Sequence, residues 1–298
     1  MENSKDKKVE TAIILAILAN VIWGFGNYFI ELSFRYASVA VTLAYRFSFS
    51  FLLLNIWLIF GKGKISLKGK NIKGLIIYTL IEPLCFFLES YGIYLTNASI
   101  SGMIAAISPI FAVILAAIFL KEYPTRLQAI FCLLPIVGVI IITLNGKSLG
   151  VAPTFGIVVL LLYAVTSGAY KAVNRGIADD FTAFERTYFL MGGCFVTYVT
   201  YALIETKCDY SLIEPLTHFE FIWPTVCLAI LNSIISNTLV NYSAKYMSAT
   251  KMATFGSIIT LTATISGVLL LNEPFSFVML IGMALILIGV YVVTTKGE

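Results

Sequence analysis

The chain has 298 residues, of which 59% are hydrophobic and only 12% charged, and its net charge is +4. Soluble domains carry about twice this share of charged residues, and one soluble core of this size could not hide so much apolar surface. The composition excludes a soluble globular domain and indicates an all-α integral membrane protein whose apolar side chains face the lipid bilayer. So small a net charge gives no reason to expect a nucleic-acid partner.

Long apolar runs predict ten membrane-spanning helices, since one crossing needs about 20 apolar residues. The first run follows a short basic segment without a small-residue cleavage site, so we expect a retained span and not a removed signal. The run 90–120 is too long for one crossing and is divided by the turn-like Thr96-Asn97-Ala98-Ser99. In chain order the predicted spans are 11–30, 38–60, 72–96, 99–120, 127–146, 148–170, 185–204, 221–244, 252–272 and 274–295.

Lysine and arginine residues lie mostly on one side of these spans, and positive residues favour the cytoplasmic side of a membrane. Only Arg35, Lys147 and Lys207 fall on the opposite side. Sixteen fall on the side that holds both termini: Lys5, Lys7, Lys8, Lys62, Lys64, Lys68, Lys70, Lys73, Lys121, Arg126, Lys171, Arg175, Arg186, Lys245, Lys251 and Lys296. We therefore expect a multi-pass protein of the cell membrane with both termini in the cytoplasm.

The second half of the chain repeats part of the first. Shifted by 151 positions (242 − 91 = 151), residues 91–143 align with 242–294, and the identical pairs include Glu122 with Glu273 and Gly138 with Gly289. The halves 1–147 and 148–298 each hold five predicted spans, and because five is odd they cross the membrane in opposite senses. This is the inverted-repeat plan of secondary transporters, which place the substrate site between the halves. Accidental similarity among apolar, glycine-rich helices is the alternative.

Several short motifs follow one another in a characteristic order: Trp23-Gly24, Tyr45-Arg46-Phe47, the small-residue stretch 99–109, and the corners Leu120-Lys121-Glu122 and Leu271-Asn272-Glu273. With the ten-span plan, they make the chain resemble the EamA-type branch of the drug/metabolite transporter superfamily. The resemblance implies a central cavity lined mainly by spans one, three, four, six, eight and nine, with spans five and ten peripheral. It also implies alternating access by rocking of the halves. The sequence departs from the pattern in span six, which lacks the common tryptophan, and at Thr260, which stands where span four has Pro109.

Three ionisable side chains deep inside the predicted spans are candidate substrate or coupling residues: Arg46, Glu82 and Glu89. A charge in hydrocarbon costs roughly 2.5–3.5 kcal/mol even on a lenient insertion scale, so each invites a functional interpretation. Glu82 is expected near the membrane midplane, where it would bind a cationic group or exchange a proton; a structural carboxyl beside Pro83 is the alternative. Glu89, seven residues on and therefore on the same helix face, is expected either to pair with Arg46 or to contact substrate.

Polar and aromatic side chains recur on single faces of the predicted spans. Spacings of three and four residues keep them on one helix face, as a cavity wall requires. Hydrogen bonding between helices would produce the same pattern. The candidates from these faces are Asn20, Trp23 and Asn27 in span one, Tyr78 in span three, Tyr163 and Tyr170 in span six, and Asn237 in span eight.

The sequence carries no signature of an enzyme, a cofactor or a metal centre. The sole histidine and all four aspartates lie outside the predicted spans, and the zinc, phosphate-loop and nucleophile-elbow motifs are absent. The five cysteines show no paired spacing. We expect a secondary transporter of a small polar metabolite, such as an amino acid, an amine or a related zwitterion or cation, with proton coupling as an option. A channel-like or receptor-like membrane protein is the alternative, although the pore loops and rings of like residues typical of channels are absent.

Overall fold

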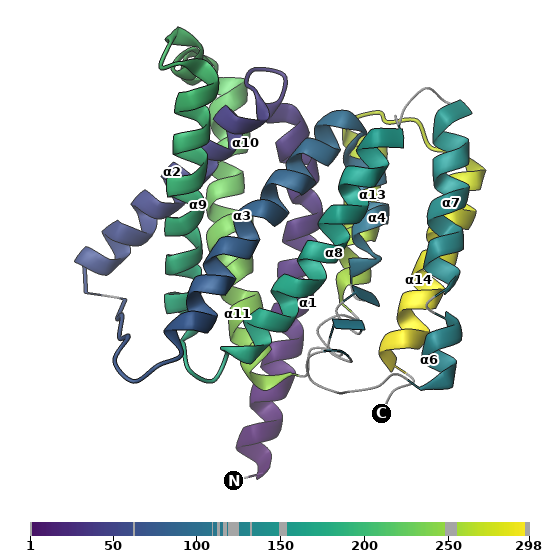
Figure 1. Ribbon diagram of the computed structural model, residues 1–298, viewed down its shortest axis with the longest axis horizontal. Coiled ribbons are helices and arrows are strands. Elements are labelled where there is room, and N and C mark those ends of the chain that lie inside the picture. Colours follow the sequence, from purple (N-terminus) through teal and green to yellow (C-terminus); the bar gives the residue numbers. More distant parts are fainter. Residues whose placement is uncertain are drawn as a thin grey trace.

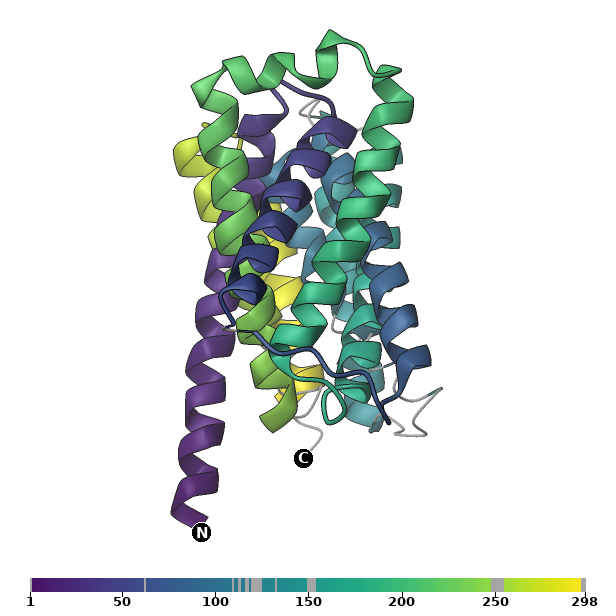
Figure 2. The ribbon, with the colours of Figure 1, turned by 90° about the vertical axis from the view of Figure 1, so that its left-hand side faces the viewer.

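The computed structural model describes residues 2–61, 63–108, 110–111, 114–115, 118, 125–131, 133–148, 154–247 and 255–295. Over these residues the chain is all-helical and has no strand, as its composition predicts. The helices form an elongated bundle, and the chain enters α1 and leaves α14 at the same end of it (Figures 1 and 2).

The helices of the first half are α1 (Glu2–Ser33), α2 (Val39–Ile59), α3 (Ile72–Leu95), α4 (Ala98–Ala105), α6 (Arg126–Phe131) and α7 (Leu133–Ser148). Of these, α2 and α3 follow the predicted spans, α1 begins earlier than predicted, and α4 is described over only the first part of the span 99–120. The predicted break falls between α3 and α4, where Asn97 accepts a hydrogen bond from the backbone N–H of Ile100 at 2.8 Å and begins α4. A side-chain acceptor at this position supplies one of the hydrogen bonds that the first turn of a helix lacks. Pro109 and the predicted corner acid Glu122 lie outside the described residues.

Helices of the second half differ from prediction in two places. The elements are α8 (Thr154–Gly176), α9 (Ala183–Thr206), two short 3₁₀ turns (Tyr210–Leu212 and Glu214–Thr217), α10 (Phe219–Cys227), the π-helix η3 (Leu228–Ser236), α11 (Asn237–Tyr246), α13 (Gly256–Leu270) and α14 (Phe277–Thr295). The predicted sixth span, 148–170, ended too early. Helix α8 continues to Gly176 because polar residues after Tyr170, such as Asn174, are buried inside the bundle and do not end the helix.

The eighth span is one helical rod with a π-helical middle that the sequence did not predict. The π-helix η3 spans Leu228–Ser236, and the side-chain amide of Asn237, the first residue of α11, donates to the carbonyl of Asn232 at 3.2 Å. π-Helical segments are rare and occur frequently at functional sites. The wider turn changes which residues face the interior, a point that matters for the cavity described below.

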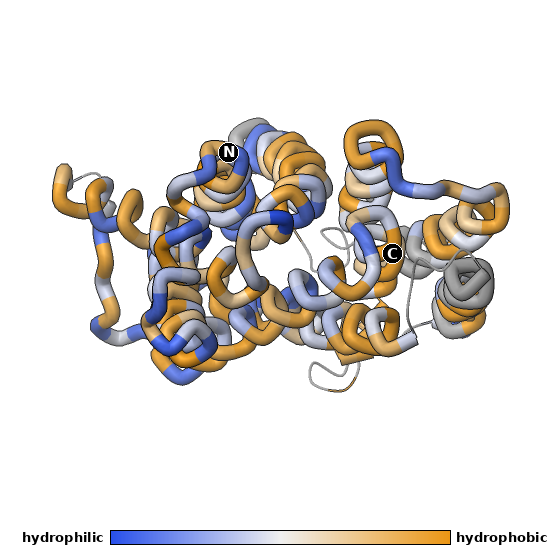
Figure 3. The backbone as a smooth tube through the Cα atoms, turned by 90° about the horizontal axis from the view of Figure 1, so that it is seen from above, coloured by the Kyte–Doolittle hydropathy of each residue, from blue (hydrophilic) through white to orange (hydrophobic). Residues whose placement is uncertain are grey.

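Within the part of the chain that the structure describes, five helical stretches are long and apolar enough to cross a membrane: Lys7–Ser33, Val39–Ile59, Thr154–Gly176, Ala183–Thr206 and Phe219–Tyr246. Shorter apolar helices, Ile258–Leu270 and Phe277–Gly289, accompany them. Large apolar side chains are exposed along the bundle, including Ile59 at 81% and Leu80 at 70%. Seen from above, hydrophobic residues occupy much of the helical surface, and hydrophilic stretches lie in the connections (Figure 3). This surface suits lipid and not water.

Helices α2 and α9 run antiparallel, whereas α3 and α9 run parallel, with Thr79 near Gly193 and Pro83 hydrogen-bonded to Tyr198. In α2 and α9, Asn55 accepts a hydrogen bond from the hydroxyl of Tyr188 at 3.0 Å, and Phe47 stacks on Tyr198. The contacting residue numbers rise along one helix while they fall along the other. Contacts between α3 and α8, α1 and α11, α4 and α13, and α7 and α14 complete the bundle. The pair α7–α14 lies at one edge (Figure 1), as the resemblance implies for spans five and ten.

Candidate functional site

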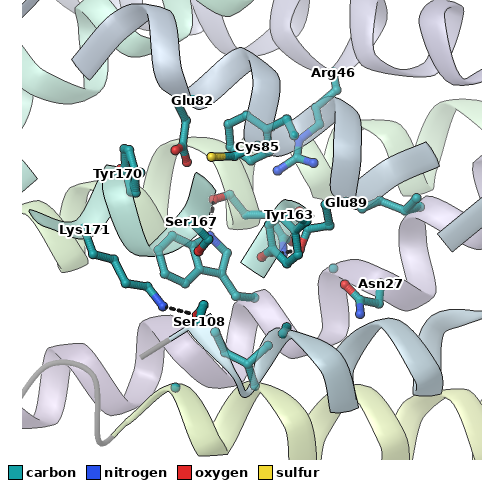
Figure 4. Close-up of a pocket in the computed structure, with 18 residues that line it drawn as sticks. Asn27, Arg46, Glu82, Cys85, Glu89, Ser108, Tyr163, Ser167, Tyr170 and Lys171 are labelled. Carbon is teal, nitrogen blue, oxygen red and sulfur yellow. Dashed lines mark hydrogen bonds between the residues drawn. The ribbon is translucent and has the colours of Figure 1, made fainter. Parts of the chain in front are cut away.

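A cavity with four ionisable side chains lies among α1, α2, α3, α8, η3, α13 and the chain after α4. Glu82, Glu89 and Arg46 line it as predicted, and Lys171 joins them. The remaining polar or aromatic lining residues are Trp23, Asn27, Phe86, Ser108, Tyr163, Ser167, Tyr170 and Asn232. Figure 4 shows these side chains converging from several helices. The family resemblance does not place span two among the helices that line the cavity, but Arg46 of this span is one of the lining residues.

The buried guanidinium of Arg46 contacts a hydroxyl and an aromatic ring but leaves one nitrogen without a hydrogen bond. Its Nε donates to Ser233 Oγ of η3 at 2.8 Å, and its Cζ lies 4.7 Å from the centroid of the Phe86 ring. The Nη1 atom is buried without a hydrogen-bond partner. An unpaired buried charge is costly, so Nη1 is available for an anionic group that enters the cavity.

Glu82 presents a second buried atom without a partner. It lies in the middle of α3 next to Pro83, is 6% exposed, and its Oε2 accepts no hydrogen bond. The carbonyl of Pro83 accepts a hydrogen bond from the hydroxyl of Tyr198, which ties this part of α3 to α9. The carboxyl of Glu82 is therefore fixed at the cavity wall with one oxygen available for a cationic group or a proton.

Glu89 does not form the ion pair with Arg46 that was one of its two expected roles. It accepts a hydrogen bond from the hydroxyl of Tyr163 at 2.9 Å, which joins α3 to α8. Among the described residues, the ion pairs within 4.0 Å are Lys70–Glu185 and Arg175–Asp179. The prediction of direct pairing is wrong because Arg46 reaches across to Ser233 while Tyr163 engages Glu89.

Lys171 is the main residue of the cavity that the sequence reasoning missed. The sequence predicts it to be a residue that flanks the membrane, because the predicted span ends at Tyr170. In the structure its Nζ donates to Ser108 Oγ at 2.7 Å across the cavity (Figure 4). Its position four residues after Ser167 and eight after Tyr163 is the signal that could have identified it, since this spacing continues the polar face of α8. Lys171 thus adds a second positive charge to the cavity, beside that of Arg46.

The other predicted residues divide between the cavity and its surroundings. Trp23 lines it and donates through Nε1 to the carbonyl of Asn232 at 3.2 Å, and Asn27 lines it and donates to the carbonyl of Ala98 at 3.2 Å. Tyr78 and Asn237 are not in the cavity wall. They lie behind Tyr170, whose hydroxyl is 3.0 Å from that of Tyr78 and donates to Asn237 Oδ1 at 3.4 Å. Their role is to position Tyr170.

Asn20 lines a second, neighbouring cavity. This cavity shares Trp23, Tyr170 and Lys171 with the central one and extends along Asn174 and Ala244. Asn20 itself donates to the carbonyl of Ala16 at 2.6 Å, within its own helix. The three shared side chains form a partition between the two cavities.

Asn232 enters the cavity wall because of the π-helix. The sequence predicts Asn237 on the inner face of span eight, as α-helical spacing requires. The wider turn of η3 brings Asn232 inward as well, and its amide donates to the carbonyl of Ile22 at 3.0 Å. The residue was missed because an i to i+5 hydrogen-bond pattern leaves no periodic signal in the sequence.

Comparison with known proteins points to one family. A family model described as the EamA-like transporter family matches the chain twice, over residues 10–144 and 154–295. The uncharacterized transporter YcxC of Bacillus subtilis (strain 168) is 31% identical over 94% of this chain and 91% of its own length. An uncharacterized transporter of Archaeoglobus fulgidus is 22% identical over 95% and 98%, respectively. A solved crystal structure that is 18% identical superposes over 96% of this chain and 97% of its own, with a TM-score of 0.67, which is evidence for the fold alone.

Proposed function

The chain belongs to the EamA-like transporter family, a family of multi-pass membrane proteins, and we propose that it carries a small zwitterionic metabolite of the amino-acid class. The central cavity is its substrate site. Transport proceeds by alternating access between two inverted five-helix halves, residues 1–147 and 148–298, which together supply ten spans. The chain acts as a carrier and not as an enzyme.

One observation carries the substrate class: two oppositely charged groups each have an unpartnered buried atom in the same cavity. Arg46 Nη1 and Glu82 Oε2 both lack a hydrogen-bond partner. A carboxylate on the substrate would satisfy the first and an ammonium group the second, which offsets the cost of leaving either charge unpaired. Lys171 and Glu89 complete a set of two acids and two bases. Such a balance favours a zwitterion over the amines and cations that the sequence also allowed.

The size of the cavity supports alternating access. Its volume is about 60 Å³, room for only a few water molecules. An amino acid can enter only if the surrounding helices move apart. The partition of Trp23, Tyr170 and Lys171 is the element whose displacement would join the central cavity to its neighbour.

Contacts at the edge of the bundle support the inverted repeat. Gly138 of α7 contacts Ile286 of α14, and Gly289 of α14 contacts Pro135 of α7. These contacts are equivalent by the repeat, since 286 − 135 = 151 and 289 − 138 = 151. Residue pairs whose numbers rise on one helix and fall on the other belong to antiparallel helices. Repeat-related helices are antiparallel when the symmetry axis lies in the membrane plane.

The orientation is proposed from the charges. The connection 63–73, with exposed Lys64, Lys68 and Lys73, lies at the end of the bundle where α1 begins and α14 ends (Figure 1). The connection between α9 and α10 lies at the other end and carries Asp209 and Glu214, and Glu220 follows in the first turn of α10. Positive residues favour the cytoplasmic side, so both termini are placed in the cytoplasm and the protein in the cell membrane.

The substrate class is tested by competition for uptake in proteoliposomes. Labelled amino acids are screened, and each hit is competed with the amine that lacks its carboxylate and the acid that lacks its ammonium group. We expect the zwitterion to be preferred over both analogues. Arg46→Gln should reduce discrimination against the amine, and Glu82→Gln should reduce discrimination against the acid, each by at least about tenfold.

Glu220→Gln, which changes an exposed carboxyl at the far end of the bundle, is the matched control and should leave both ratios unchanged. Equal transport of zwitterion and amine by the wild type, with the ratio unaffected by Arg46→Gln, would refute the assignment.

A further inference from the structure

An apolar groove opens on the outside of the bundle, away from the substrate cavity. Its walls include Leu53 and Trp57 of α2, Phe184 near the start of α9, and Ile235 and Leu239 of η3 and α11. The last turns of α2 diverge from the rest of the bundle (Figure 1), and the groove between them has a volume of about 880 Å³. This is near the upper end of the range for small-molecule sites.

Positive charge lies at one end of this groove. Lys64 is one of its lining residues, and the connecting segment 61–73 contains five lysines and no acid. Lys70 is already engaged, since its Nζ lies 2.8 Å from Glu185 Oε2. Lys64, Lys68 and Lys73 are exposed. An apolar groove within the bilayer that ends at basic side chains matches an amphiphile with a negative head group.

A second copy of the chain is a poorer occupant. Most homodimers are two-fold symmetric, and a two-fold contact centred on this groove would bring the lysines of both copies together. Like charges facing each other across an interface oppose association. We propose that the groove binds an anionic phospholipid, with an acyl chain along Trp57 and Ile235 and the phosphate at Lys64.

This site would be coupled to the substrate cavity through η3. Ile234 and Ile235 form part of the groove, while the preceding residues, Asn232 and Ser233, turn inward to hold Trp23 and Arg46. A lipid chain against the outer side of η3 therefore packs behind the segment that positions two cavity residues. Binding of the phospholipid does not depend on the proposed transport function, so it can be tested without a transport assay.

The experiment uses the purified full chain in detergent and follows the fluorescence of Trp57. Phosphatidylglycerol with a brominated acyl chain is titrated in, and the same is done with brominated phosphatidylcholine. Quenching of Trp57 fluorescence should need a lower concentration of brominated phosphatidylglycerol than of brominated phosphatidylcholine. Trp57→Phe should remove the quenching although Trp23 and Trp223 remain.

The contribution of the positive charge of Lys64, at one end of the groove, is then tested by substitution. Lys64→Gln should weaken binding of phosphatidylglycerol about fivefold, the effect expected of one lysine near an anionic membrane surface, and should leave phosphatidylcholine unaffected. Lys245→Gln, an exposed lysine at the end of α11, is the control and should bind like the wild type. Equal affinity for the two lipids, or quenching that persists in Trp57→Phe, would overturn the proposal. So would a dimer that shields Trp57 from both lipids.

Discussion

At Glu82, a buried carboxyl oxygen has no protein donor, and this makes it the residue on which coupling should depend. The carboxyl must be protonated or engaged by a cation for much of the transport cycle, because an unpaired charge there is costly. We predict that Glu82→Gln leaves the protein folded but abolishes accumulation driven by an imposed pH gradient. Uptake into proteoliposomes with and without the gradient measures this.

The two roles open to Glu82 give different residual activities. If the residue exchanges the coupling proton, passive exchange of substrate should survive in Glu82→Gln and lose its dependence on pH. If it binds the ammonium group, substrate binding itself should fail. Wild-type accumulation and an unchanged pH response would leave Glu82 a structural carboxyl beside Pro83.

The hydrogen bond between Glu89 and Tyr163 leads to a second prediction. Glu89→Gln and Tyr163→Phe should each lower the melting temperature, and the double variant should lose less than the sum, because both remove the same 2.9 Å contact. A net loss of about 1–2 kcal/mol is expected for a hydrogen bond to a charged group. Additive losses in the Glu89→Gln, Tyr163→Phe double variant would contradict the observed contact.

Much of the cavity could be predicted from single residues. Glu82, Glu89 and Arg46 stand out because charges are rare in apolar runs, and Trp23, Asn27, Tyr163 and Tyr170 because they recur at helical spacing. Lys171 escaped since a lysine near the end of a predicted span is normally a flanking residue. Which polar atoms lack a partner could not be predicted at all, because it depends on distances between side chains from different helices.

At the scale of elements, the carboxylate of Glu273, in the second half of the chain, caps the N-terminus of helix α4 in the first half. It accepts hydrogen bonds from the backbone N–H groups of Ala98 at 2.8 Å and Ser99 at 2.9 Å. Negative charge at a helix N-terminus is stabilising, and these donors would otherwise lack a partner. The corner acid, which the sequence identified only through its repeat, thus joins α4 to the turn between α13 and α14.

A third prediction concerns the backbone N–H of Ala98, which donates to the carboxyls of both Glu273 and Glu31. Glu31 also accepts from the Ala98 N–H, at 3.1 Å, so two acids face one amide. Two carboxylates this close repel each other unless they share a proton. We predict that Glu273→Gln lowers stability by about 1–2 kcal/mol, because an amide oxygen replaces a bidentate carboxylate. Glu31→Gln should leave stability unchanged or raise it.

Thermal unfolding in detergent at neutral pH checks both signs, with Glu220→Gln as an exposed control. Equal losses for Glu31→Gln and Glu273→Gln would show that the two acids contribute alike and that no repulsion exists between them.

The elements themselves were predictable to different degrees. Lengths and positions of α2, α3 and α9 follow from apolar runs bounded by Ser38, Asn71 and Thr182, each of which caps its helix. The π-helix η3 was not predictable, since Leu228–Ser236 has an ordinary apolar composition and its hydrogen-bond pattern is set by packing around it. That one element altered the inner face of the eighth span and brought Asn232 to the cavity.

For the whole molecule, the placement of charge predicts its orientation. Lysine-rich 63–73 and acidic 209–220 lie at opposite ends of the bundle (Figure 2). We predict that an impermeant thiol reagent applied to intact cells labels a cysteine introduced at Asp209 and spares one introduced at Lys68. The native Cys208 is exposed beside Asp209, so it is replaced by serine in both variants. The reverse labelling pattern would invert the proposed topology.

The last prediction separates a carrier from a channel, the alternative that the sequence left open. The central cavity has a volume of only about 60 Å³, and four ionisable side chains converge on it. A site that must open to one side, bind and then open to the other can pass only one substrate per cycle. Flux in proteoliposomes should therefore saturate with substrate, and unlabelled substrate on the far side should accelerate exchange by returning the carrier in its loaded form. Flux that rises linearly with concentration, or unitary currents across a planar bilayer, would establish a continuous pore and rule out alternating access for this protein.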